Sequence, residues 1–152
     1  MIREYTAEEH SLHEGEEDKL TKFMKGFEQA TEEVKVDMHY AWSMYDKMMQ
    51  SGAVKVWVAE TDEGIMQGAI GVMFSKDLHK DKKIAVELFW FVDPTYKGIG
   101  KLLFNKYEEE AIKAGCKMLA MIHLSDSYPE SLKEFYVKNG YHLTECHYIK
   151  EI

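Results

Sequence analysis

The segment Phe91–Leu103 carries the most specific chemistry in this chain. An apolar run ends at Asp93-Pro94, and two glycines, Gly98 and Gly100, then bracket a single residue. This pattern predicts a strand, a short loop and the start of a helix. The first N–H groups of a helix have no internal partner, and the peptide dipoles add partial positive charge there. Because glycine lets a phosphate approach those groups, the segment predicts an anion site that favours a phosphorylated cofactor.

Backbone amides around the two glycines are the candidate anion ligands. They can cradle a pyrophosphate, and they belong to Tyr96, Lys97, Gly98, Ile99, Gly100 and Lys101. The side chains of Lys97 and Lys101 add positive charge beside these amides. The structural alternative is an ordinary tight turn between a strand and a helix.

Glu87 is the candidate base for proton transfer. It is the only acid in the apolar strand predicted over Ile84–Val92. Burial raises the pKa of an unpaired carboxylate, which suits proton abstraction near neutral pH. Strand alternation places Glu87, Phe89 and Phe91 on one face, and a β-bulge would change that assignment. The alternative is a surface acid near the start of the strand.

The elements that must position these residues follow from periodicity and turn signals. The expected elements are strands over 2–6, 54–60, 65–74, 84–92 and 117–124; amphipathic helices containing Leu20–Phe27 and running from Thr31 to Gly52; helices over 100–114 and from Ser127 to Gly140; and a last strand or strand pair over 141–149. The order β-α-α-β-β-β-α-β-α-β predicts an α/β fold with a mixed sheet and helices on both faces.

Composition bounds the class of protein. With 152 residues, we expect one domain over residues 1–152. The formal net charge of −8 argues against nucleic acid as a partner. The chain has no apolar run as long as a membrane span and no signal-peptide pattern. Two cysteines, Cys116 and Cys146, are expected to be buried, reduced thiols, which favours a cytoplasmic location.

Two segments together resemble a known family. Residues 92–103, Val-Asp-Pro-Thr-Tyr-Lys-Gly-Ile-Gly-Lys-Leu-Leu, resemble the acetyl-coenzyme A motif of the GNAT N-acetyltransferase superfamily. Residues 131–141, which contain Tyr136 followed by Gly140-Tyr141, resemble its second motif. The chain departs from the family pattern at Thr95 and Tyr96, where that family has Arg or Gln and then Gly, and at Pro129, where it often has Asn.

The resemblance implies a mostly antiparallel GNAT sheet and acetyl transfer from acetyl-CoA to an amine, by direct attack in a ternary complex. It implies that Tyr136 protonates the leaving thiolate and that a backbone N–H near Phe91 and Val92 stabilises the thioester oxygen. In place of the missing Asn, Ser125 and Ser127 can bind the pantetheine arm. No metal is expected.

The identity of the acceptor stays open between a small cationic amine and a protein amine. Residues 1–33 hold ten acidic and four basic side chains, which favours a positively charged acceptor. The resemblance also allows a homodimer, because many members of that family pair through their sheets. The departures from the motif keep a second function open: a non-catalytic GNAT-fold protein that binds coenzyme A or serves as an interaction module.

Overall fold

The computed structural model describes residues 1–9, 18–28, 38–124, 129–148, 150 and 152. The chain divides into two units, Met1–Ile122 and His123–Ile152, and each unit is described by itself below. The predicted single domain over residues 1–152 stays a prediction.

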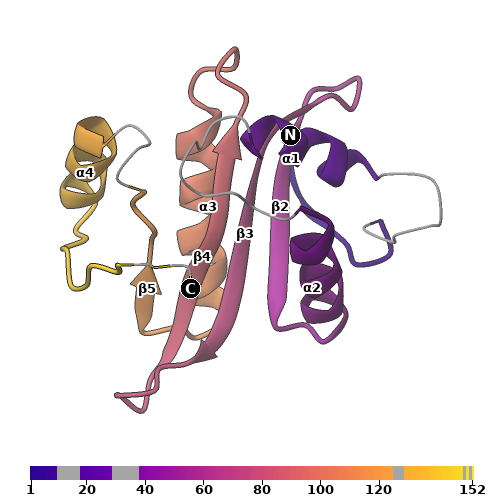
Figure 1. Cartoon of the computed structure of the whole chain (residues 1–152). Coiled ribbons are helices and arrows are strands. Elements are labelled where there is room, and N and C mark those ends of the chain that lie inside the picture. Colours follow the sequence, from indigo (N-terminus) through magenta and orange to yellow (C-terminus); the bar gives the residue numbers. More distant parts are fainter. Residues whose placement is uncertain (10–17, 29–37, 125–128, 149, 151) are drawn as a thin grey trace. The chain divides into compact units, whose positions relative to one another are not determined.

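The first unit is built on a five-stranded sheet in the order β1-β2-β3-β4-β5 (Figure 1). The strands are β1 Ile2–Tyr5, β2 Val54–Glu60, β3 Met66–Lys76, β4 Lys83–Val92 and β5 Met118–Ala120. The pairs β1–β2, β2–β3 and β3–β4 are antiparallel, and β4–β5 is parallel. A parallel pair needs a crossover, which helix α3, Ile99–Lys113, supplies. The predicted mixed, mostly antiparallel sheet is confirmed.

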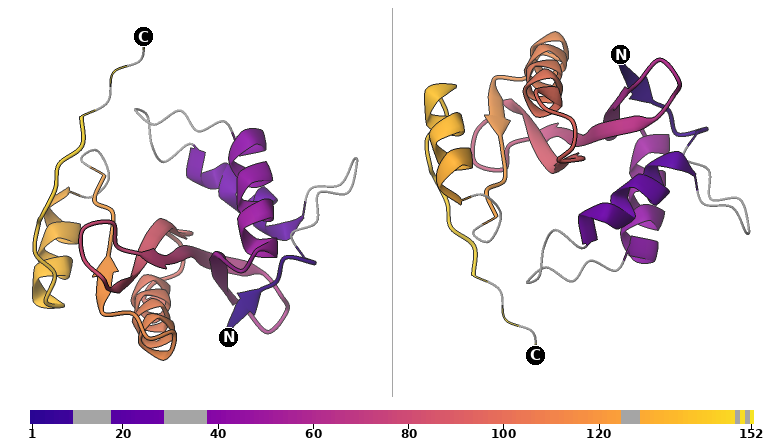
Figure 2. Two further views of the ribbon diagram at one scale, coloured as in Figure 1. Left: turned by 90° about the horizontal axis from the view of Figure 1, so that it is seen from below. Right: turned by 90° about the horizontal axis from the view of Figure 1, so that it is seen from above.

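Helices cover both faces of this sheet, as predicted. Helices α1, Lys19–Glu28, and α2, Met38–Gln50, lie on one side and α3 lies on the other (Figure 2). The core on the α1–α2 side comprises Tyr5, Leu20, Met24, Trp42, Met49, Val54, Val56, Val58, Met66, Ala69 and Phe89. The core on the α3 side comprises Trp57, Ala59, Ile70, Val72, Ala85, Leu103, Tyr107 and Ala111. Within the described ranges, no helix has the length and hydropathy needed to cross a bilayer.

Strand β4 contains a β-bulge, the feature that decides on which face of the sheet each of its side chains lies. Glu87 and Phe89 pair with the adjacent residues Val72 and Gly71, so Leu88 is the extra residue. The bulge changes the phase of the strand. Ala85 therefore packs in the α3-side core, whereas Phe89 packs in the α1–α2-side core. Glu87 lies at the switch between the two phases.

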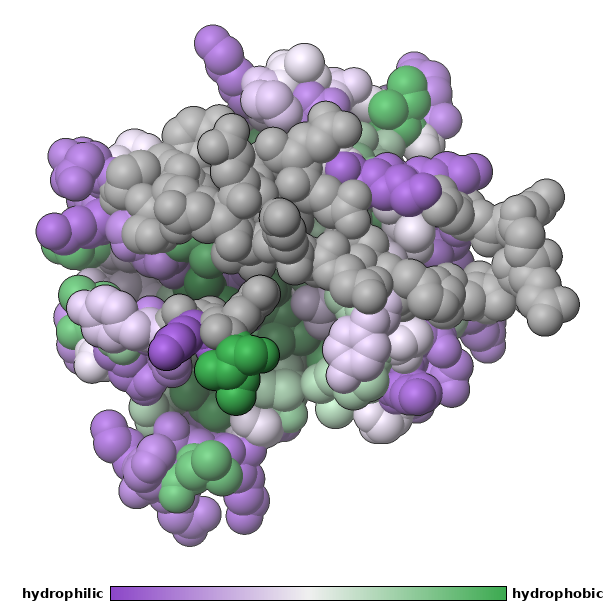
Figure 3. All heavy atoms as spheres, in the orientation of Figure 1, coloured by the Kyte–Doolittle hydropathy of each residue, from purple (hydrophilic) through white to green (hydrophobic). Residues whose placement is uncertain are grey.

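Residues 77–82 form the turn between β3 and β4. All six of these residues are exposed or half-buried, and Leu78 is 95% exposed. The turn forms the mostly hydrophilic projection at the bottom of Figure 3.

The second unit contains helix α4, Pro129–Lys138, which bears Tyr136. The strand predicted over 141–149 was wrong for the described residues 141–148, none of which is in a strand. Most of these residues are exposed, and polar side chains interrupt the apolar ones. A strand without a partner to receive its backbone hydrogen bonds is marginal in water, which explains the difference.

Two further predictions were wrong: the length of the strand over 117–124 and the burial of the two cysteines. β5 spans three residues rather than eight, because its pairing with β4 ends at Val86 and Ala120. Neither cysteine is buried: Cys116 is half-buried in the turn after α3, and Cys146 is exposed in the segment after α4. Both are free thiols, as expected. Cys116 lies next to the edge strand β5, and Cys146 lies in a segment without helix or strand, so apolar neighbours in the sequence do not bury either thiol.

Gly71 provides the space into which Phe89 packs after the bulge. A Cβ added at Gly71 would overlap the Phe89 ring. We expect Gly71→Ala to destabilise the protein by about 3 kcal/mol, the upper range for overpacking a core. Gly26→Ala is the control, because its Cβ would lie 3.8 Å from the Phe91 ring, an ordinary contact. That variant should stabilise α1 by about 0.5–1 kcal/mol. Urea unfolding measures both, and equal stability of the two variants would contradict this packing.

Candidate active site

The loop between β4 and α3 is held by hydrogen bonds that begin at Asp93. Its backbone N–H donates to the Gln67 carbonyl of the neighbouring strand region at 2.9 Å. The Asp93 carboxylate accepts from the Thr95 hydroxyl at 2.6 Å and from the Thr95 N–H at 2.9 Å. These bonds lower the pKa of Asp93. The Tyr96 N–H donates to the Asp93 carbonyl at 3.0 Å, so this amide is engaged within the turn.

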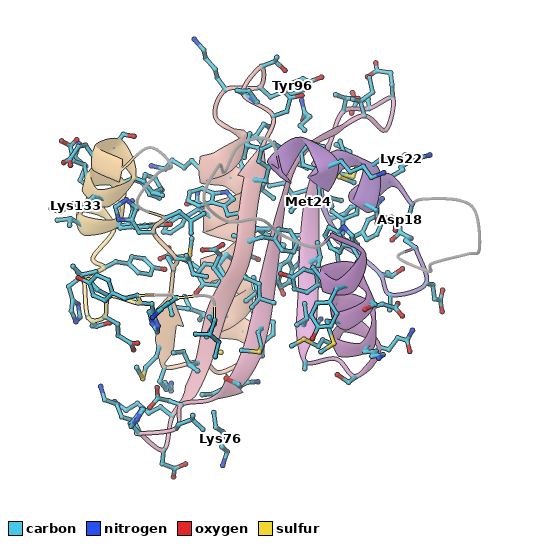
Figure 4. All side chains as sticks on the ribbon, in the orientation of Figure 1. Asp18, Lys22, Met24, Lys76, Tyr96 and Lys133 are labelled. Carbon is cyan, nitrogen blue, oxygen red and sulfur yellow. The ribbon has the colours of Figure 1, made fainter. Side chains whose placement is uncertain are left out.

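Helix α3 begins without a side-chain cap. Gly98 has φ of 84°, in the left-handed region, and no side chain accepts from the first turn. The five consecutive N–H groups of Lys97–Lys101 have no acceptor among the described residues. Helix α1 differs, because the Asp18 carboxylate (Figure 4) accepts from the Leu20 and Thr21 N–H groups at 2.8 and 3.0 Å. The start of α3 is thus a row of open donors.

Close packing fixes the position of this helix start. A Cβ at Gly100 would lie 3.3 Å from the Trp90 ring of β4. A Cβ at Gly68 of β3 would lie 2.9 Å from Leu103 Cδ1 and 3.0 Å from Ile99 Cγ2. The two glycines therefore let the first turn of α3 approach β3 and β4 closely without displacing the neighbouring side chains. A Cβ at Gly98 would meet nothing within 4 Å, so that glycine serves conformation rather than packing.

Two lysines at the start of α3 have no ion-pair partner among the described residues. Lys97 and Lys101 are exposed and form no salt bridge within that part of the chain. Lys106 and Lys113, farther along the same helix, pair with Glu110 at 2.7 and 3.1 Å. The positive charge of α3 is therefore neutralised in its later turns and available in its first turn. The Tyr96 side chain projects from the adjoining loop (Figure 4).

Glu87 is buried in the middle of β4, not at the surface near the strand start. It is 4% exposed, and its Oε2 accepts from the Ile122 N–H at 2.8 Å. Burial raises the pKa of Glu87 to about 7, and the hydrogen bond from Ile122 opposes this shift. Burial raises the pKa values of Tyr45 on α2 and Tyr107 on α3, and the charge of Glu87 adds to both shifts. A carboxylate of this kind can exchange a proton near neutral pH.

We call the point where β4 and β5 stop pairing, at Val86 and Ala120, the β4–β5 fork. β4 continues from Glu87 to Val92 beyond it. The Tyr107 hydroxyl contacts carbonyls on both strands at the fork, those of Ala85 at 2.9 Å and Ala120 at 3.0 Å. Tyr107 lies in the helix predicted over 100–114 and was not among the predicted site residues. The available signal was the hydroxyl itself, since a buried Tyr O–H usually has a partner.

The other predicted site residues lie in different surroundings. Phe91 and Val92 pair with Ala69 and Gly68 of β3, at the end of β4 that leads into the loop. Tyr136, in the second unit, is 8% exposed, and its ring packs 5.9 Å from that of Tyr141. Ser125 and Ser127 lie outside the described residues. Within the described part of the chain, no three His, Cys, Asp or Glu side chains are grouped to hold a metal ion.

Sequence comparison identifies the family. The profile of the acetyltransferase (GNAT) family matches residues 16–141, and the chain belongs to this family. No curated protein sequence matches the chain.

Solved structures share the fold at low sequence identity. A predicted acetyltransferase with acetyl-CoA from Clostridium acetobutylicum is 14% identical, with a TM-score of 0.74 over 99% of this chain and 95% of its own. A ribosomal-protein-alanine N-acetyltransferase from Brucella melitensis is 15% identical, with a TM-score of 0.71 over 100% and 99%. An aminoglycoside acetyltransferase from an uncultured soil sample is 13% identical, with a TM-score of 0.75 over 100% and 97%. At these identities the likeness concerns the fold.

The buried carboxyl of Glu87 makes stability depend on pH. Its pKa rises from the ordinary 4.5 to about 7 in the folded state, which therefore binds the proton more tightly than the unfolded state. The free energy of unfolding should fall by about 3 kcal/mol as pH rises from about 4.5 through about 7. Glu87→Gln, which is neutral throughout, should remove this fall. The variant should match wild type near pH 4.5 and exceed it at pH 8 in urea unfolding; parallel profiles would contradict the assignment.

Proposed function

We propose that this protein transfers an acetyl group from acetyl-CoA to a primary amine. The observation that carries the proposal is the row of open N–H groups over Lys97–Lys101 at an uncapped helix start. Such a row suits the diphosphate of coenzyme A, because backbone donors and the helix dipole both favour an anion. Lys97 and Lys101 supply the matching side-chain charge. Because the Tyr96 N–H already donates to the Asp93 carbonyl, the first backbone N–H proposed to bind the diphosphate is that of Lys97.

The proposed reaction needs three groups besides the donor site. The acceptor nitrogen attacks the thioester carbon and loses a proton, for which the Glu87 carboxylate is the proposed base. A backbone N–H near Phe91 and Val92 is proposed to stabilise the thioester oxygen as it gains negative charge. The carbon–sulfur bond then breaks, and the departing thiolate takes its proton from the Tyr136 hydroxyl. Ser125 and Ser127 are proposed to bind the pantetheine arm.

The acceptor class proposed is a primary amine, either a small cationic amine or a protein amine. The acidic composition of residues 1–33 supports a positively charged acceptor. The names of two structures of similar fold refer to one acceptor of each kind, an aminoglycoside and the alanine of a ribosomal protein. A cytoplasmic location and a homodimer belong to the same proposal.

Coenzyme A binding tests the proposed donor site with matched glycine variants. Gly98 and Gly115 lie at opposite ends of α3, both have positive φ, of 84° and 78°, and an added Cβ meets nothing within 4 Å at either. Gly98→Ala and Gly115→Ala should each cost about 1 kcal/mol of stability through backbone strain. Only Gly98→Ala should weaken coenzyme A binding, by about tenfold, because it disturbs the row of N–H groups. Calorimetric titration measures the dissociation constants.

The outcomes of this titration separate the two functions that the sequence left open. Wild type at one hundred times the dissociation constant should gain about 2.7 kcal/mol of stability. Absence of binding at millimolar coenzyme A would overturn the proposal. Binding without thiol release across small amines and amine-bearing peptides would favour the non-catalytic alternative. Equal weakening in both glycine variants would place the donor elsewhere.

Tyr136 should act on the chemical step rather than on binding. Tyr136→Phe keeps the ring and removes the hydroxyl, so we expect kcat to fall by about one hundredfold, the lower range for general acid catalysis. The KM for acetyl-CoA should change by less than about twofold, because uniform binding is kept. Tyr141→Phe, on the neighbouring ring of the same unit, is the control and should retain kcat. Thiol release under saturating donor measures both; unchanged kcat in Tyr136→Phe would remove its catalytic role.

A further inference from the structure

We propose that Tyr107 and Glu87 are positioning residues that hold the β4–β5 fork at a fixed opening and thereby align the acetyl-CoA arm. The inference rests on the proposed function, because the donor must extend from the start of α3 along β4. It assigns a role to Tyr107 that neither motif contains. It also gives Glu87 a role that does not require proton transfer.

Tyr107 connects the two strands next to their last pair, Val86 and Ala120. Its hydroxyl lies within hydrogen-bond distance of the Ala85 carbonyl on β4 and the Ala120 carbonyl on β5. One hydroxyl proton is thus shared between two carbonyls that belong to diverging strands. Tyr107 is fully buried in the α3-side core, so its ring has little freedom to follow one strand away from the other.

Glu87 makes a second connection just beyond the first. It lies two residues after Ala85 on β4, and its Oε2 accepts from Ile122, two residues after Ala120. The Glu87 carboxylate therefore accepts from a backbone N–H that would bond to a β4 carbonyl if the pairing of β4 and β5 continued. Oε1 of Glu87 has no hydrogen-bond partner among the described residues, so this role leaves one oxygen for proton transfer.

The surroundings of Glu87 contain two tyrosines and no opposing charge among the described residues. Tyr45 of α2 and Tyr107 of α3 are the titratable groups that sense its charge, one from each face of the sheet. The only hydrogen bond to the carboxylate is that of the Ile122 N–H, within the same part of the chain. A carboxyl group keeps an acceptor oxygen in either protonation state, so the contact with the Ile122 N–H does not require ionisation of Glu87.

Helix α3 joins the fork to the proposed diphosphate site. Tyr107 lies eight residues after Ile99, which is about 12 Å along a helix. The same rigid element carries the open N–H groups at its start and the Tyr107 hydroxyl in its middle. Gly68 and Gly100 hold that element closely on β3 and β4. A change in the spacing between β4 and β5 at the fork would therefore alter the position of a bound thioester relative to the proposed diphosphate site.

The test uses coenzyme A alone, so it does not depend on an acceptor. Tyr107→Phe removes both contacts and keeps the ring. Glu87→Leu removes the acceptor for Ile122, whereas Glu87→Gln keeps an acceptor and cannot ionise. We expect Tyr107→Phe and Glu87→Leu to raise the dissociation constant of coenzyme A by about tenfold, because the donor path is no longer fixed. Glu87→Gln should stay within about twofold of wild type.

Tyr5→Phe is the matched control for a buried tyrosine. Tyr5 is 3% exposed, and its hydroxyl contacts the Glu9 carbonyl at 3.1 Å and Asp18 Oδ1 at 3.0 Å. It lies on β1, at the opposite edge of the sheet from the fork. Its loss should lower the thermal midpoint and leave the dissociation constant of coenzyme A unchanged. Equal weakening by Tyr5→Phe and Tyr107→Phe would reduce the Tyr107 effect to general destabilisation and overturn the proposal.

Amide hydrogen exchange of Ile122 provides a readout that needs no ligand. Exchange should accelerate by about tenfold in Glu87→Leu and stay close to wild type in Glu87→Gln, because only the former loses the acceptor. Equal exchange in these two variants, or unchanged coenzyme A binding in Tyr107→Phe and Glu87→Leu, would overturn the positioning role. Failure of wild type to bind coenzyme A would instead remove the proposed function, and this role in donor alignment with it.

Discussion

The first turn of α3 lies against β3 and β4 at two glycines, and this contact fixes where the helix begins. A Cβ at Gly68 would press on Leu103 and Ile99, and a Cβ at Gly100 would press on Trp90, so these neighbouring side chains would have to shift. Backbone hydrogen bonds hold the loop before α3. The Asp93 N–H donates to the Gln67 carbonyl, and the Asp93 carbonyl accepts from the Tyr96 N–H. The open N–H groups of Lys97–Lys101 are consequently held in place before any ligand arrives. Preorganised donors of this kind bind an anion without reorganisation.

The sheet that carries this helix divides at one edge. β4 and β5 pair over three residues, and β4 then continues alone toward the loop. Beyond that point the Glu87 side chain connects the two segments by accepting from the Ile122 N–H, and Tyr107 contacts both strands where their pairing ends. A buried carboxyl lowers stability at neutral pH, as its raised pKa implies. Residues that are costly for stability and specific in geometry are commonly those that serve function.

Local sequence signals predicted most of the fold. The helix starting near Gly100, the hairpin over 54–74 and the apolar strand over 84–92 agree with α3, β2–β3 and β4 within a few residues. Predictions failed where an element depended on a distant partner. The apolar run over 117–124 pairs for only three residues, and residues 141–148 form no strand. The burial expected for Cys116 and Cys146 failed as well, since Cys116 lies next to the edge strand β5 and Cys146 lies in a segment without a strand.

The sequence by itself determined the family, the order of most elements and a helix start near Gly100 behind a two-glycine loop, because turns, periodicity and glycine positions act over a few neighbouring residues. Tertiary structure alone decided the bulge at Leu88, the burial of Glu87 and the partners of the Tyr107 hydroxyl. Each depends on the register between strands far apart in sequence or on a helix that packs across them. Alternation along β4 cannot predict this change of phase, because the change depends on the packing of Phe89 against Gly71, which lies on the neighbouring strand.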